Sequence, residues 1–219
     1  MRSSWRNNGV CVLALALAAI ASVDLSAHRL DEYLQAARIA IDPDRVRIEL
    51  DLTPGIAVAD RVMSVIDRDR SGTISVDEAD AYAASVRAAI ALELDGRALA
   101  LELVKSEFPG IESAVKGEGT VRLELAAATN GLLSGAHRLT FRNAHRPDIG
   151  VYLANALVPA SPRVSVSAQR RDVDQRELTV DYVLTETSSD WLDRWTLVNA
   201  GGLIAVVAAL WWRSRPRSL

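Results

Sequence analysis

Short segments in which every second residue is apolar are the feature that most constrains the fold of this chain. Such alternation is typical of strands with one face on a core and the other in water. Two pairs of segments flank turn residues, Asp42-Pro43-Asp44 and Asp95-Gly96, and the second turn is typical of a type I′ hairpin. The alternating segments are residues 35–41, 45–52, 92–94, 98–103, 121–125, 138–142, 163–167 and 177–184. Eight short strands at this spacing predict a mainly β fold, an antiparallel sandwich with one polar face per strand.

One helical stretch interrupts the strands. Apolar residues follow a helical period in residues 55–66 and again in residues 76–91. Residues 67–78 connect these two stretches and include the first residues of the second. They carry oxygen-bearing side chains at alternating positions and a glycine, Gly72, at the sixth position. Ca²⁺ takes six to eight oxygen ligands, and such a loop supplies them. The expected ligands are Asp67, Asp69, Ser71, the Thr73 carbonyl, Ser75 directly or through water, and a bidentate Glu78.

This segment resembles the EF-hand family over the loop and both helices, about residues 55–91. The resemblance implies calcium as the bound ion. EF-hands usually occur in pairs, but only one loop is present here, so Ile74 lacks an evident partner loop. Arg68 and Arg70 alternate with the ligands and weaken the negative field. We therefore expect a dissociation constant of about 10⁻⁴–10⁻³ M and a mainly structural ion.

Both ends of the chain are predicted to lie outside this fold. Two arginines, an apolar run and a small-residue tail give residues 1–27 the layout of a signal peptide. Residues 195–212 are uncharged and have tryptophans at both ends, which predicts a single transmembrane helix. Three arginines in residues 213–219 predict a cytoplasmic tail. A domain of residues 28–190 would then lie on the outer side of a bacterial inner membrane.

Composition narrows the function classes. Cys11, the one cysteine, falls within the predicted signal peptide, so the mature region has no disulfide and no Cys-zinc site. Residues 28–212 hold 20 basic and 27 acidic residues, which argues against binding nucleic acid. No Gly-x-Ser-x-Gly, phosphate loop or HExxH motif is present, so we expect a protein that is not an enzyme.

A second resemblance covers residues 28–184. It depends on four stretches, 27–33, 50–55, 142–148 and 155–159. They are similar to the extracytoplasmic region ahead of nickel/cobalt-permease-like (HupE/UreJ-type) membrane domains of bacteria. This chain has one predicted membrane helix rather than several, so it cannot transport an ion alone. We expect its domain to contact another envelope or membrane protein.

Two alternatives stay open at this point. If the signal peptide is cleaved after Ala27, His28 becomes the N-terminal residue, and its amine and imidazole could bind copper, nickel or cobalt together with His145. The chain would then be an accessory factor for a transition metal. In the other alternative, the domain is a structural adaptor whose EF-hand no longer binds an ion.

Overall fold

The computed structural model describes residues 31–186. The predicted signal peptide with His28, the membrane helix 195–212 and the tail 213–219 lie outside the described residues. The elements in chain order are β1 (Tyr33–Ile41), β2 (Arg45–Pro54), α3 (Ile56–Ile66), α4 (Val76–Ala88), β3 (Ile90–Leu94), β4 (Arg97–Ala98), β5 (Glu102–Glu107), α5 (Ile111–Val115), β6 (Val121–Ala128), β7 (Gly135–Asn143), β8 (Gly150–Ala156), β9 (Val164–Arg171) and β10 (Glu177–Leu184). Within the described range, none of the helices is both long enough and apolar enough to cross a bilayer.

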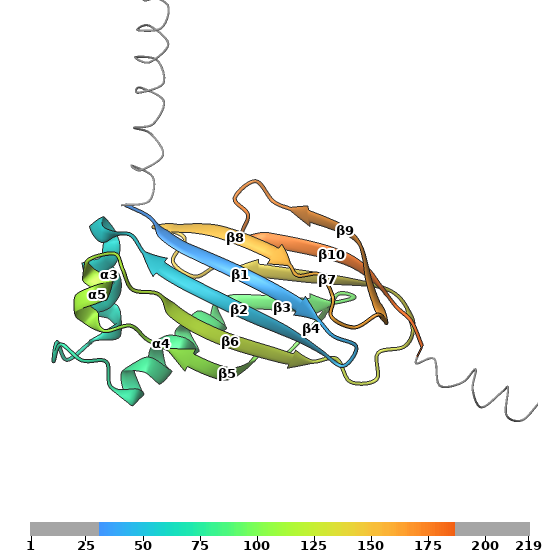
Figure 1. Ribbon diagram of the computed structural model, residues 1–219, viewed down its shortest axis with the longest axis horizontal. Helices are drawn as coiled ribbons and strands as arrows, with labels where there is room; N and C mark the ends of the chain where they lie inside the picture. Colours follow the sequence, from blue (N-terminus) through green and yellow to red (C-terminus); the bar gives the residue numbers. More distant parts are fainter. Residues whose placement is uncertain (1–30, 187–219) are drawn as a thin grey trace, which may run out of the picture. The chain divides into compact units, whose positions relative to one another are not determined.

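The strands form two five-stranded sheets, in the orders β5-β6-β2-β1-β8 and β4-β3-β7-β10-β9. Figure 1 shows the first sheet lying over the second as the two layers of a sandwich. Alternate residues of most strands point inward and form one apolar core, in which Ile39, Ile48 and Leu125 are buried. The predicted mainly β sandwich is therefore confirmed.

One strand pair departs from the predicted antiparallel pattern. β8 runs parallel to β1, in register from Tyr33↔Gly150 to Ile39↔Ala156. The sequence did not indicate β8, because its outward residues are apolar as well. Val151 and Leu153 are 37 % and 40 % exposed, so apolar and polar residues do not alternate.

The two predicted hairpins are present, but the second is shorter than expected. Asp95 and Gly96 have φ values of 52° and 77°, and positive φ at both positions is what a type I′ turn requires. The predicted strand 98–103 is wrong as a single strand. β4 ends at Ala98, and β5 begins at Glu102 in the other sheet, because the chain crosses between the two sheets there.

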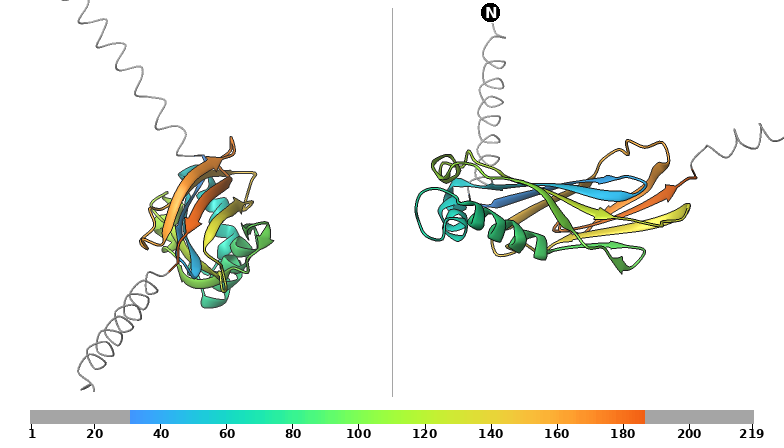
Figure 2. Two further views of the ribbon diagram at one scale, coloured as in Figure 1. Left: turned by 90° about the vertical axis from the view of Figure 1, so that its right-hand side faces the viewer. Right: turned by 90° about the horizontal axis from the view of Figure 1, so that it is seen from below.

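The helical stretch lies between a strand of each sheet, since β2 precedes it and β3 follows it. The predicted helix 76–91 ends earlier, at Ala88, because Ile90 already belongs to β3 and is buried with it. The sequence did not predict α5. α4 packs against β5 and β3 and so covers the side of the sandwich between these strands, as the right-hand view in Figure 2 shows. The loop between α3 and α4 is mostly exposed, and Asp67 at its start and Ile74 near its end are its more buried residues.

Candidate metal centre

The loop begins at Asp67, directly after the last residue of α3. The apolar face of α3 packs into the core along residues that include Val58, Val62 and Ile66, spaced by one helical turn. Asp67 follows as the C-cap residue, and its backbone N–H donates to the Met63 carbonyl. Because the helix is fixed by this burial, the Asp67 carboxylate is fixed at the start of the loop.

The loop then wraps around the Asp67 carboxylate. Arg70 and Gly72 adopt positive φ values of 57° and 82°, which turn successive backbone N–H groups inward. The Ser71 N–H donates to Oδ1 of Asp67 and to Oδ1 of Asp69, at 3.0 Å each. The Gly72 N–H donates to Oδ2 of Asp67 at 3.0 Å. This sharp turn is the one that the position of Gly72 predicted.

Glu78 closes the loop from the first turn of α4. Ser75 is the N-cap of α4 and forms a capping box with Glu78. Oε1 of Glu78 accepts from the backbone N–H of Arg68 at 2.7 Å, and Oε2 accepts from the Ser75 N–H and hydroxyl at 3.0 and 2.8 Å. The hydrogen bonds from Ser75, followed by those from Arg68 and Asp69, lower the pKa of Glu78 to about 2. Glu78 is therefore ionised at neutral pH.

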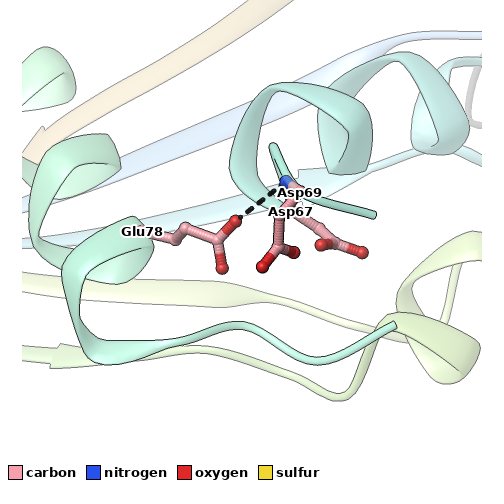
Figure 3. A group of neighbouring side chains, drawn as sticks. All are labelled: Asp67, Asp69 and Glu78. Carbon is pink, nitrogen blue, oxygen red and sulfur yellow. Dashed lines mark hydrogen bonds between the residues drawn. The ribbon is translucent and has the colours of Figure 1, made fainter. Parts of the chain in front are cut away.

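Three carboxylates meet in this loop. Asp67, Asp69 and Glu78 each place an oxygen within 4.8 Å of the others. Figure 3 shows Glu78 reaching from α4 toward Asp67 and Asp69, with one hydrogen bond from the Asp69 backbone to Glu78. Over the described part of the chain, none of the three forms an ion pair with a basic side chain, although Arg68 and Arg70 are neighbours in sequence. A hard divalent cation fits this donor set, because all the ligand atoms are oxygens.

The other predicted ligands lie in the same loop. The Ser71 hydroxyl donates to the Thr73 carbonyl at 3.0 Å, so both belong to the inner hydrogen bonding of the loop. Ser75 is engaged in the capping box, and a bound ion would reach it through water or after a small rearrangement. Ile74 packs against the apolar core and is not paired with another strand.

His145 lies in a different place from the loop. It is 7 % exposed, and its Nε2 is 3.1 Å from the Tyr82 hydroxyl. Burial, followed by the charge of Arg146, lowers the pKa of His145 to about 4, so the ring is neutral at neutral pH. His137 lies elsewhere, with Nδ1 2.8 Å from Oδ2 of Asp95. A transition-metal site that joins His145 to His28 stays a prediction, since His28 is outside the described residues.

No family model, curated protein or solved structure matches this chain. Both resemblances noted in the sequence, to EF-hands and to the region ahead of HupE/UreJ-type membrane domains, therefore stay predictions. The function has to be inferred from the chemistry of the described residues themselves.

Proposed function

We propose that this protein binds one calcium ion in the loop of residues 67–78, and that the ion mainly stabilises an extracytoplasmic domain. The observation that carries the proposal is the group of Asp67, Asp69 and Glu78, whose oxygens lie within 4.8 Å of one another. Like charges at such short separations repel, and in the described residues no ion pair with a basic side chain removes the repulsion; backbone N–H donors offset it only in part. A divalent cation removes this cost, so binding and folding of the loop support each other.

The donor set favours calcium over a softer metal. The three carboxylates and the Thr73 carbonyl are hard oxygen ligands, and the loop contains neither histidine nor cysteine. Several backbone N–H groups orient the carboxylates of Asp67 and Glu78, so the loop's own hydrogen bonds help to place these proposed ligands. Calcium tolerates irregular coordination at 2.3–2.6 Å, which suits a twelve-residue loop of this kind.

Contacts of the two helices support a structural rather than a signalling role. On α3, the Arg61 guanidinium is 2.6 Å from Oδ2 of Asp148. On α4, the Tyr82 hydroxyl contacts His145. Both partners belong to the segment between β7 and β8, so one segment holds both helices. Signalling EF-hands open their helix pair on binding calcium, and these contacts oppose such an opening.

The concentration of calcium outside the cytoplasm also suits a structural role. With a dissociation constant of about 10⁻⁴ M and free calcium of about 10⁻³ M, binding adds roughly 1.4 kcal/mol to the free energy of unfolding. A site of this affinity would be mostly filled at all times. It would stabilise the domain steadily and report little about changes in calcium.

Thermal unfolding of the full-length chain, purified in mild detergent, tests the proposal. Calcium should raise the midpoint by about 3–6 °C over the value in chelator. Glu78→Gln keeps the shape of the side chain but removes its charge, so the rise should largely disappear. Asp77→Asn is the matched control, because Asp77 is an exposed neighbour on the same helix turn, and the rise should persist. An unchanged wild-type midpoint would overturn the proposal.

The location is part of the same proposal. We place the domain outside a bacterial inner membrane, anchored by residues 195–212 and in contact with another envelope or membrane protein. Its support is the pattern of the two chain ends, including the arginines of residues 213–219. A reporter fused after Leu219 should behave as cytoplasmic, and one inserted near Ser189 as exported. An exported Leu219 fusion would contradict this topology.

A further inference from the structure

α4 connects the calcium loop directly to the core of the sandwich. Glu78 and Tyr82 are four residues apart, which places both side chains on one face of the helix. Both are buried, Glu78 in the loop and Tyr82 in the apolar core. The remaining buried residues of α4 are Ala83 and Val86, which are small. Tyr82 is therefore the largest anchor that holds this helix in place.

The Tyr82 hydroxyl is held from two sides. It lies 2.6 Å from the Tyr33 hydroxyl on β1 and 3.1 Å from Nε2 of His145. The rings of Tyr82 and His145 meet edge to face, with centroids 5.6 Å apart. Burial raises the pKa of Tyr82 to about 12, so its phenol keeps the proton. With Nε2 as the acceptor, Tyr33 donates to Tyr82, and Tyr82 donates to His145.

His145 is itself fixed by bonds that do not involve α4. Its backbone N–H donates to Oδ1 of Asn143 at 2.9 Å. Its carbonyl accepts from Nε2 of Gln35 at 2.8 Å and from the Tyr152 hydroxyl at 2.7 Å. The Asn143 amide also donates to Oε1 of Gln35. Residues from β1, β7 and β8 therefore hold the acceptor for Tyr82 in a set position.

We propose that Tyr82 is a positioning residue for the calcium site. A roll or shift of α4 would move Glu78 and Tyr82 together, because both project from the same helix face. The hydrogen bonds of Tyr82 restrict this roll or shift of the helix. They thereby hold the Glu78 carboxylate next to Asp67 and Asp69. The inference rests on the proposed calcium binding and adds to it that affinity is set partly in the core, outside the loop.

Thermodynamic coupling makes the relation reciprocal. If the Tyr82 contacts favour the helix position in which calcium binds, then calcium must favour the Tyr82 contacts by the same factor. The effect of calcium should therefore be detectable at His145, which is not a predicted calcium ligand.

A titration of the full-length chain with calcium, measured by isothermal titration calorimetry, tests the proposal. Tyr82→Phe removes one hydroxyl and keeps the ring, and it should raise the dissociation constant for calcium about threefold or more. Tyr182→Phe is the matched control: Tyr182 is a buried tyrosine on β10, next to His137 and not on α4, and its loss of a hydroxyl should leave the constant unchanged. If the wild type binds calcium and Tyr82→Phe binds it equally well, the positioning role is wrong. If the wild type binds none, the proposed function itself fails.

A second measurement needs no core substitution, in case Tyr82→Phe does not fold. In a chain labelled with ¹⁵N-histidine, calcium should shift the ring resonances of His145, and Glu78→Gln should abolish the shift. His137 is the internal reference, because it contacts Asp95 and the Leu133 carbonyl and not α4, and its resonances should stay in place. Unmoved His145 resonances at saturating calcium would overturn the proposal.

Discussion

Two groups of polar side chains each include one residue of α4, Glu78 in the first and Tyr82 in the second, one helical turn apart. The two groups differ in how their charge and polarity are compensated. The calcium loop gathers Asp67, Asp69 and Glu78 without a basic partner in the described residues. The buried group of Tyr33, Gln35, Tyr82, Asn143 and His145, here named the Tyr–His network, is neutral at neutral pH, and its members are hydrogen-bonded to one another. Backbone N–H groups bind the loop carboxylates, and we propose that a cation from solution balances the remaining negative charge. The network is neutral and has no charge to balance. Changes to the network should cost stability with or without calcium, and changes to the loop should act mainly through the ion.

The largest expected difference between the two is in their response to acid. Burial, then Arg146, lowers the pKa of His145 to about 4 in the folded chain, against about 6.5 when unfolded. Between these values the unfolded chain binds a proton that the folded chain does not, so stability falls as the pH falls from about 6.5 to about 4. The expected loss is about 3 kcal/mol. Glu78 behaves differently, because its pKa is lowered to about 2 and its contribution is lost only below about pH 4.5.

Urea unfolding in chelator at pH 7, 5.5 and 4 measures this loss. His145→Gln removes the titrating ring, so its stability should change much less over the same range, while the Glu78 contribution below pH 4.5 should remain. A wild-type curve that parallels that of His145→Gln between pH 6.5 and 4 would show that the network does not hold a neutral histidine.

A somewhat smaller effect is expected from breaking the network at Gln35. Gln35→Ala leaves the Asn143 amide and the His145 carbonyl each without one buried partner. Leaving buried polar groups unsatisfied should lower the free energy of unfolding by about 2 kcal/mol. The loss should appear in chelator as well as in calcium, because the unsatisfied groups lie outside the loop. A somewhat larger loss in calcium would measure the coupling from His145 through Tyr82 to the loop. Gln169→Ala, at an exposed position of β9, is the control and should cost far less. A loss found only in calcium would contradict the separation of the two groups.

The third and smallest expected effect is a loss of stability from changing the backbone conformation of the loop at Gly72. Gly72 has a φ of 82°, a conformation that side chains rarely adopt, so Gly72→Ala should cost about 1 kcal/mol and weaken calcium binding. Gly110→Ala is the control, because Gly110 has a φ of −63° and open space around its Cα. Denaturant unfolding and calcium titration of both variants check this. Equal stabilities of the two variants would mean that the turn at Gly72 is not needed.

The sequence predicted the loop far better than it predicted the network. The proposed calcium ligands all lie within twelve residues, so their spacing in the sequence is enough to predict that they lie together. Tyr33, Tyr82 and His145 are separated by 49 and 63 residues, and only the packing of both sheets brings them together. A signal was nevertheless present: Gln35 occupies an inward position of β1, between Tyr33 and Ala37, where a polar side chain must find a buried partner.

The presence or absence of a local sequence pattern also explains why some strands were predicted and others were not. β2 and β10 alternate cleanly because one face of each is solvated. β8 has apolar residues on both faces, and its parallel partner β1 is more than a hundred residues away in sequence. Such a long-range pairing leaves no local pattern, so it could not be predicted from the segment itself.

Direct titration of calcium into the full-length chain tests the central claim most simply. Calorimetry on the wild type should report one ion per chain with a dissociation constant of about 10⁻⁴–10⁻³ M. Glu78→Gln, which keeps the size of the side chain without its charge, should weaken binding at least about tenfold, and Asp77→Asn should leave it unchanged. Absence of binding by the wild type at millimolar calcium, or equal binding by Glu78→Gln, would contradict the assignment of Asp67, Asp69 and Glu78 as a calcium site.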